Sequence, residues 1–191
     1  RLEEWRQTEW PGLRVWLPPV TDHWSVITVA GPRSRRVVAA LAPGLDLAGF
    51  PFMTWREATV LGVAGARILR VSFSGELCYE IHVPSWYGAA VWDAVLELGA
   101  VPYGTEAMHV LRAEKGHILI GHETDGTVIP HDLGLARLVA TGKRDFIGKR
   151  SFARPDARRP DRRRLVGLLP EDPAALVDEG AQLIAPDGDG P

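Results

Sequence analysis

Residues 70–83 read R-V-S-F-S-G-E-L-C-Y-E-I-H-V, and this stretch decides the fold. Its second half alternates in polarity, so Tyr79 shares one face of a strand with positions 81 and 83, while positions 78, 80 and 82 share the other. The first half belongs to a second β-rich run. Ser74, Gly75 and Glu76 stand between the two runs and predict a turn. We therefore expect two strands joined by a turn that carries the carboxylate of Glu76.

The segments before this stretch predict further strands. Residues 24–30, W-S-V-I-T-V-A, are β-rich and nearly all apolar, which indicates a buried strand. Residues 57–63 and 66–72 predict two more strands, joined near Gly65. The strand at residues 77–83 follows them along the chain.

Helical segments alternate with these strands. Each predicted helix has a start or stop signal at its end. The predicted helices cover residues 33–41 after Gly31-Pro32, residues 86–98 with Ser85 as the cap, and residues 106–115 with Thr105 as the cap and Gly116 as the end. Strands and helices are thus interleaved around a hairpin, which indicates an α+β fold with a split βαβ or ferredoxin-like layout.

The composition changes sharply near residue 160. Residues 154–164, R-P-D-A-R-R-P-D-R-R-R, predict an exposed linker, and residues 165–169 predict a new strand. We therefore place one domain over residues 1–160 and the start of another over 161–191. The apolar run 181–185 before a Pro- and Gly-rich end looks like a strand that enters a turn, so we expect the chain to be a fragment.

The overall composition excludes several classes of protein. A net charge of -2 over 191 residues argues against nucleic-acid binding, and no apolar run is long enough for a membrane span. The first ten residues do not form a secretory signal, so we expect a cytoplasmic protein. Cys78 is the only cysteine, and the six histidines lack zinc-ligand spacing. We expect an inert thiol and no metal site.

Two charged residues have alternative interpretations. Glu76 is either a solvated turn carboxylate or an acceptor of two parallel hydrogen bonds from a ligand, such as the adjacent N–H groups of a pterin. Arg112 falls on the apolar stripe of its helix with Met108, where a guanidinium needs an anion or acceptors. It either reaches solvent or an internal carboxylate such as Glu114, or it contacts a ligand.

Four stretches in order resemble the aminomethyltransferase, or T-protein, family of folate-binding domains. They are A-G-P-R at 30–33, R-V-S-F-S-G-E-L-C-Y-E-I at 70–81, L-R-A-E-K-G at 111–116 with Gly121-His122 after it, and D-F-I-G-K at 145–149. Within the family, the segments T-E-W-P at 8–11, Y-G-T-E-A-M at 103–108 and T-D-G-T-V at 124–128 are similar to the alpha subunits of heterotetrameric sarcosine oxidases.

The resemblance implies a fold and a set of site residues. The fold would be a T-protein-like domain with a mixed or antiparallel sheet and packed helices, lacking its N-terminal part and followed by the start of a small β-barrel. Glu76 would hold the pterin ring, Arg112 would lie in or beside the folate site, and Tyr79 would line it. The family's essential Asp falls upstream of residue 1, so no catalytic residue is expected here and the chain alone should be inactive.

The resemblance also implies a reaction and partners. Oxidative demethylation of sarcosine to glycine would pass a one-carbon unit to tetrahydrofolate as 5,10-methylenetetrahydrofolate, or release it as formaldehyde. FAD, FMN and NAD would belong to the full complex and not to this chain. The partners would be the beta, gamma and delta subunits and the small-molecule folate, without nucleic acid or membrane.

Three alternatives remain open from the sequence. The first is a glycine-cleavage aminomethyltransferase, and the second is a scaffold that has lost folate binding. The third is a folate-binding protein of iron–sulfur assembly. That group has a K-G-C-Y-x-G-Q-E motif, whereas His117 follows Lys115-Gly116 in this chain.

Overall fold

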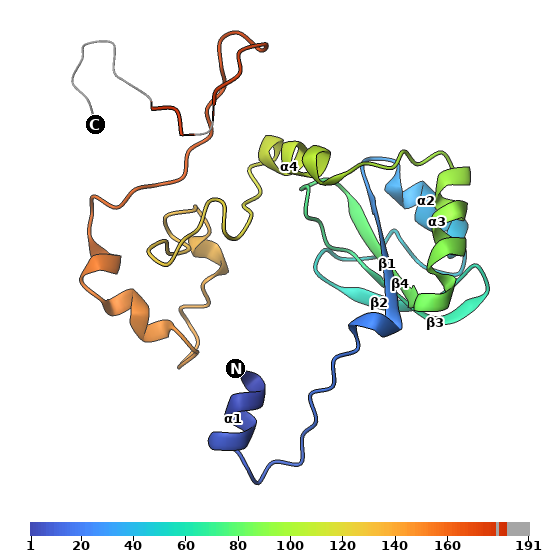
Figure 1. Cartoon of the computed structure of the whole chain (residues 1–191), viewed down its shortest axis with the longest axis horizontal. Coiled ribbons are helices and arrows are strands. Elements are labelled where there is room, and N and C mark those ends of the chain that lie inside the picture. The colour runs from blue at the N-terminus through green and yellow to red at the C-terminus, as the bar shows by residue number, and fades with distance from the viewer. Residues whose placement is uncertain (179, 183–191) are drawn as a thin grey trace. The chain divides into compact units, whose positions relative to one another are not determined.

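The computed structural model describes residues 1–178 and 180–182. The chain divides into two compact units, Arg1–His117 and Ile118–Pro191. The first holds the sheet and the α-helices, and the described residues of the second form loops and short 3-10 helices (Figure 1).

The first unit is organised around a four-stranded antiparallel sheet. The strands are β1 (Trp24–Ala30), β2 (Trp55–Val60), β3 (Val63–Leu69) and β4 (Cys78–Pro84), in the order β1-β4-β3-β2. Ile81 of β4 lies opposite Ile27 of β1 and Ile68 of β3 in the register. β4 pairs with both β1 and β3, so residues 78–83 lie inside the sheet. Residues 70–77 form the connection from β3, which ends at Leu69 and not at the predicted residue 72. The antiparallel sheet with its helices confirms the α+β prediction.

The β2–β3 hairpin turns at a different position from the predicted one. The turn is formed by Leu61 and Gly62, whose φ values of 48° and 82° suit a two-residue hairpin loop that matches the twist of its strands. Gly65 lies inside β3 with φ of 74°, beside a shift in register between Ala58 and Val60. The prediction of a turn near Gly65 was wrong because this glycine serves a β-bulge instead.

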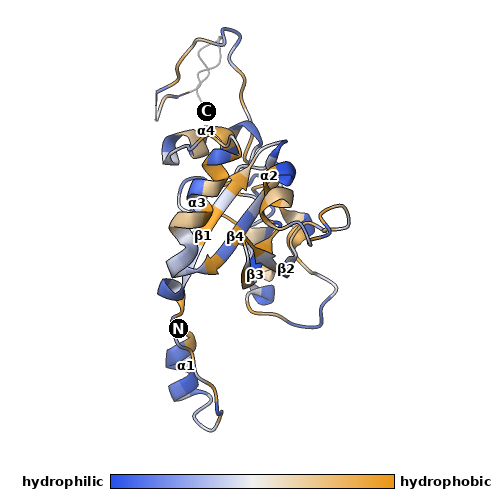
Figure 2. Cartoon of the chain, turned by 90° about the vertical axis from the view of Figure 1, so that its right-hand side faces the viewer, coloured by the Kyte–Doolittle hydropathy of each residue, from blue (hydrophilic) through white to orange (hydrophobic). Residues whose placement is uncertain are grey.

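Helices α2 (Ser34–Leu41) and α3 (Gly88–Glu97) cover one face of the sheet and contact each other (Figure 1). The side chains of Tyr79, Ile81 and Val83 point to this face and are fully buried, as their alternation predicts. Figure 2 shows the corresponding alternation of hydrophobic and hydrophilic residues along β4. The rest of the core comes from both helices, the other strands and the connections: Ile27, Val29, Val37, Val38, Leu41, Ala42, Leu47, Phe50, Val60, Ala66, Ile68, Val91 and Val95.

The two predicted helix caps are absent. Ser85 begins a 3-10 turn, η2 (Ser85–Tyr87), and α3 starts only at Gly88 without a side-chain cap. Helix α4 (Thr105–Glu114) contains Thr105 as its first residue and follows Gly104. The first turn of α3 is positioned by close packing of Gly88 on Ser25 of β1. The contact leaves no room for a side chain, because a Cβ at Gly88 would lie 2.3 Å from the Oγ of Ser25. Ser25 in turn donates a hydrogen bond to the carbonyl of Ser85, at 3.2 Å.

The remaining helical segments are short. They are α1 (Leu2–Thr8), η1 (Thr21–His23), η3 (Ala136–Leu138), η4 (Lys149–Ala153) and η5 (Asp156–Arg158). None of the helices among residues 1–178 and 180–182 is long and apolar enough to cross a membrane.

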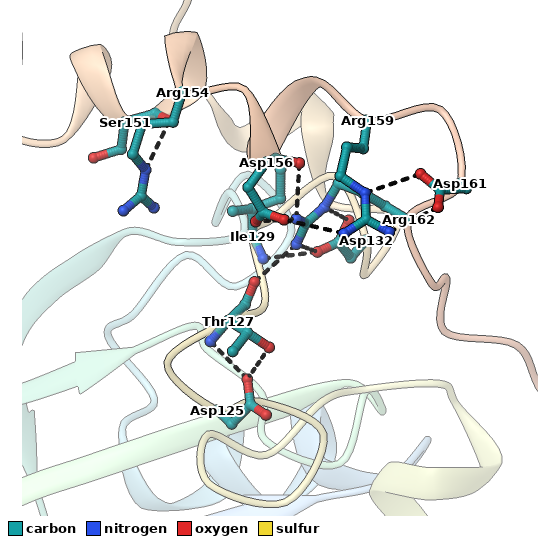
Figure 3. A network of polar contacts seen from close by, with 10 residues as sticks. All are labelled: Asp125, Thr127, Ile129, Asp132, Ser151, Arg154, Asp156, Arg159, Asp161 and Arg162. Carbon is teal, nitrogen blue, oxygen red and sulfur yellow. Dashed lines mark hydrogen bonds and ion pairs between the residues drawn. The ribbon is translucent and has the colours of Figure 1, made fainter.

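The second unit differs from the prediction in two respects. Residues 165–169 form no strand, because no described segment of this unit offers them a strand to pair with. Most of the arginine-rich segment is exposed, but Arg162 is only 15% exposed and bonds to Asp132, Asp156 and the carbonyl of Thr127 (Figure 3). A β-barrel start is not seen among the described residues after 160, and the predicted strand at 181–185 lies mostly outside them. The domain boundary near 160 stays a prediction.

Candidate functional site

The candidate site lies where the turn before β4 meets the end of α4. The turn contains Ser74, Gly75 and Glu76. Gly75 has φ of 79°, and a Cβ on it would lie 2.6 Å from the Cβ of Lys115 and 2.9 Å from two ring atoms of His117. Only glycine combines this backbone conformation with so close an approach. Two segments that are about 40 residues apart in the sequence therefore meet without an intervening side chain.

Backbone hydrogen bonds at the C-terminus of α4 fix the positions of Lys115 and His117 against Gly75. Lys115 is the last residue with helical backbone, and Gly116 follows in the left-handed region with φ of 67°. The amide of His117 donates to the carbonyl of Arg112 at 2.8 Å, and the amide of Gly116 donates to the carbonyl of Ala113 at 2.9 Å. These two bonds form a Schellman motif, which gives Lys115 and His117 defined positions against the turn.

Glu76 forms an ion pair with Lys115 across this contact. The ammonium nitrogen of Lys115 lies 2.6 Å from Oε1 of Glu76. The Glu76 side chain is 30% exposed and that of Lys115 is 46% exposed, so a ligand can reach the carboxylate. The hydrogen bond to Glu76 raises the pKa of Lys115, so its ammonium stays charged at neutral pH. The turn carboxylate thus has a cationic neighbour and retains acceptor capacity.

Arg112 lies one helical turn before this contact and is 9% exposed. Its Nη1 donates a hydrogen bond to the carbonyl of His117 at 3.2 Å. The backbone of Arg112 also accepts from His117, so the two residues are bonded in both directions. The interpretation that Arg112 reaches into solvent is wrong for this structure, since the guanidinium is buried at the end of α4.

A third segment reaches the same turn through Leu77. The carbonyl of Leu77 accepts hydrogen bonds from the amide of Gly31, at 2.8 Å, and from the hydroxyl of Ser34, at 2.9 Å. Gly31 and Ser34 flank the turn between β1 and α2. The segments 30–33, 70–81 and 111–116 therefore converge on one place. The fourth segment, 145–149, is in the second unit.

Tyr79 is fully buried beneath the site. Its ring lies 6.0 Å from that of Phe50, and its hydroxyl accepts a hydrogen bond from Nε of Arg35 at 3.4 Å. The ring is part of the hydrophobic core, so it supports β4 from below rather than facing solvent.

Cys78 has no features of a nucleophile. It is 3% exposed, and burial, followed by the charge of Glu80, raises its pKa to about 11. A thiol with this pKa is protonated at neutral pH and reacts slowly. Among the residues that the structure describes, no cluster of His, Cys, Asp or Glu could hold a metal ion.

With this geometry established, comparison with known proteins gives the family. The sequence profile of the GCVT N-terminal domain matches residues 1–143. The chain belongs to the GCVT N-terminal domain family. This family assignment agrees with the resemblance of the segments that meet at the Gly75 turn.

Sarcosine oxidase alpha subunits and aminomethyltransferases are among the relatives of this GCVT domain. Sarcosine oxidase subunit alpha of Corynebacterium sp. (strain P-1) is 53% identical over 190 residues, which is 96% of this chain and 20% of the relative. The subunit of the same name from Rhizobium meliloti (strain 1021) is 40% identical over 96% of the chain and 19% of the relative. Aminomethyltransferase from Ralstonia nicotianae is 33% identical over 86% of the chain and 44% of its own length. The chain spans about a fifth of the sarcosine oxidase subunits that it matches.

Sequence reasoning selected Glu76 and Arg112 but did not identify the residues that join them. Gly75, Lys115 and His117 form that connection. The one available signal was Gly116, the predicted helix end. A glycine with left-handed backbone at that position reverses the chain direction at the end of the helix. Its neighbours Lys115 and His117 are therefore placed against the segment that packs on the helix end.

Proposed function

We propose that the GCVT domain contributes the pterin-binding side of a tetrahydrofolate site, and that Glu76 is its central residue. The observation that carries the proposal is the Glu76 carboxylate, which is 30% exposed and held in a turn fixed by Gly75 against Lys115. An ionised carboxylate accepts two parallel hydrogen bonds. The pyrimidine part of a pterin offers two adjacent N–H donors of that geometry.

Two hydroxyls of the same segment are consistent with a polar ligand. Those of Ser72 and Ser74 are buried and have no hydrogen-bond partner among the described residues. A buried hydroxyl without a partner is unfavourable, so a polar group that a ligand brings to this segment would satisfy it. Arg112 would maintain the end of α4 beside the ligand. Tyr79 would act from beneath the site by supporting β4.

We further propose that the whole protein is a sarcosine oxidase alpha subunit, in which this domain receives the one-carbon unit. The methyl group of sarcosine would be oxidised by two electrons, with a flavin outside this chain as acceptor, and glycine would be released. The carbon would pass to tetrahydrofolate as 5,10-methylenetetrahydrofolate, or water would take it as formaldehyde. The role of this chain would be to bind and orient the folate. Alone it would be inactive.

The setting of this activity is also a proposal. The names of the relatives refer to a subunit, which supports a multi-subunit complex. We propose beta, gamma and delta subunits as partners, FAD, FMN and NAD bound outside this chain, and a cytoplasmic location. A second candidate is an aminomethyltransferase of the glycine-cleavage type, supported by the 33% identical relative. The higher identity and fuller coverage of the sarcosine oxidase subunits favour the first candidate.

Calorimetric titration with 5-formyltetrahydrofolate tests the site. We expect Glu76→Gln to weaken binding about tenfold or more, because a hydrogen bond to a charged group contributes about 1.5–3 kcal/mol. Arg112→Met should also weaken it. The matched control is Glu97→Gln, which removes an exposed carboxylate at the end of α3. Equal binding by the Glu76 and Glu97 variants would contradict the proposal. If the chain alone does not bind 5-formyltetrahydrofolate, the same titration of the full-length protein and its Glu76→Gln variant shows whether the complete site binds it through Glu76.

A further inference from the structure

We propose that Lys115 is a positioning residue for the folate site: it holds Oε1 of Glu76 so that the rest of the carboxylate is presented to the pterin. The inference rests on the function proposed for Glu76 and adds a second residue to that site. It depends on three observations, namely the ion pair, the fixed backbone of Lys115 and the packing of its Cβ on Gly75.

The first step concerns the side-chain geometry. Lys115 has a flexible side chain, but both of its ends are constrained. Its backbone is the C-cap residue of helix α4 inside a Schellman motif, which Gly116 and the hydrogen bond from the His117 amide to the Arg112 carbonyl complete. Its Cβ packs against Gly75, and its ammonium nitrogen ends 2.6 Å from Glu76. The same lysine therefore contacts the turn at its base and the carboxylate at its tip.

The second step concerns the acceptor capacity of the carboxylate. A carboxylate has two oxygens with about four lone-pair directions. The ammonium of Lys115 uses one of them on Oε1. The remaining directions, including all of Oε2, are sufficient for the two parallel N–H groups of a pterin. The ion pair and the ligand can therefore occupy Glu76 at the same time.

The third step concerns charge. When a ligand covers Glu76, the carboxylate loses part of its hydration, which is unfavourable for a charged group. The ammonium of Lys115, 2.6 Å from Oε1, offsets this loss because it places the opposite charge beside the carboxylate. Lys115 would thus compensate the charge of Glu76 in the bound state as well as fix its orientation.

A competing possibility is that Lys115 occupies the place of the ligand and must leave. The two ideas predict opposite changes. Removal of a competitor would tighten binding, whereas removal of a positioning cation would weaken it. The measurement is the affinity for 5-formyltetrahydrofolate of the wild-type chain, Lys115→Met, Glu76→Gln and the double variant, which form a double-mutant cycle.

We expect Lys115→Met to weaken binding about three- to tenfold, as for loss of a partly exposed ion pair that the ligand covers further. In the Glu76→Gln background the same change should have little effect, because Lys115 acts through Glu76. Lys115→Arg should recover most of the affinity by restoring the cation. The matched control is Lys143→Met, which removes an exposed lysine of the second unit. Urea unfolding checks that all variants fold.

Three results would overturn the inference. These are unchanged or tighter binding by Lys115→Met, an equal loss in the Glu76→Gln background, and an equal loss in Lys143→Met. If Glu76→Gln weakens binding but Lys115→Met does not, the inference fails and the proposed function stands. If the wild-type chain and the full-length parent both fail to bind, the proposed function fails, and the role of Lys115 with it.

Discussion

Gly75 lies so close to Lys115 that a Cβ on the glycine would stand 2.6 Å from the Cβ of the lysine. This contact joins the turn that carries Glu76 to the end of α4, which carries Arg112. The GCVT domain thereby brings together two segments that are separate in its sequence. Four predictions test this arrangement and the structure around it.

The first prediction concerns Gly75→Ala, with Gly65→Ala as the control. Both glycines have a left-handed backbone, with φ of 79° and 74°, so both variants should lose about 1–2 kcal/mol of stability. A Cβ at Gly65 meets open space, whereas one at Gly75 would overlap Lys115 and His117. Gly75→Ala should therefore lose about 1–3 kcal/mol more.

Urea unfolding followed by tryptophan fluorescence measures this difference, because all seven tryptophans lie within residues 1–117. Gly75→Ala should also weaken folate binding, and Gly65→Ala should not. If the two variants are equally stable, the contact between Gly75 and Lys115 is not tight in solution.

The second prediction concerns Tyr79. Since its hydroxyl has one long bond to Arg35 and its ring is fully buried, Tyr79→Phe should cost less than about 1.5 kcal/mol. Tyr79→Ala should cost about 3–5 kcal/mol, as for other large-to-small changes of aromatic core residues. Chemical unfolding gives both values. Loss of folate binding by a stably folded Tyr79→Phe would instead show that the hydroxyl reaches the ligand.

The third prediction concerns Asp132 and Arg162 in the second unit. Hydrogen bonds from Arg162 lower the pKa of Asp132 to about 2 (Figure 3). Because this pKa lies below the usual value of about 3.9, the pair stabilises the unit fully above about pH 4. The stabilisation is lost as the pH falls from about 4 through 2. Asp132→Asn should abolish that dependence.

At neutral pH, Asp132→Asn should destabilise the unit, because it removes the carboxylate that accepts two hydrogen bonds from Arg162 and leaves Asp156 as the remaining carboxylate partner of that guanidinium. Hydrogen exchange of peptides covering residues 127–165 measures the loss, since this unit lacks tryptophan. Asp161→Asn is the control, because the Asp161–Arg159 pair is more than half exposed and should contribute little to stability. Similar losses from both variants would contradict the structure.

The fourth prediction concerns Cys78. With a pKa of about 11, its thiol should remain protonated and react very slowly with an aromatic disulfide reagent at pH 8. Denaturation in urea should expose it and give one fast equivalent. Since the unfolded thiol ionises near pH 8.5, this group should also reduce stability as the pH rises from about 8.5 towards 11. Rapid labelling of the native chain would contradict its burial in β4.

Local sequence patterns were sufficient to predict most of the helices and strands and the α+β class. Alternation along residues 77–83 assigned Tyr79, Ile81 and Val83 to one face, and Gly116 marked the end of α4. These features depend on neighbouring residues, so local patterns contain the information. The family followed from the sequence as well, because its motifs occur in order along one chain.

The exact ends of these elements and the contacts between them became clear only in the folded chain. The hairpin turn lies at Leu61-Gly62 and not at the predicted Gly65, and α3 begins at Gly88. Residues 165–169 do not form the predicted strand. The fold also pairs Glu76 with Lys115 and buries Arg112 against His117. The reason is physical: the partners are distant in sequence, and a side chain's neighbours are set by packing, which no local pattern specifies.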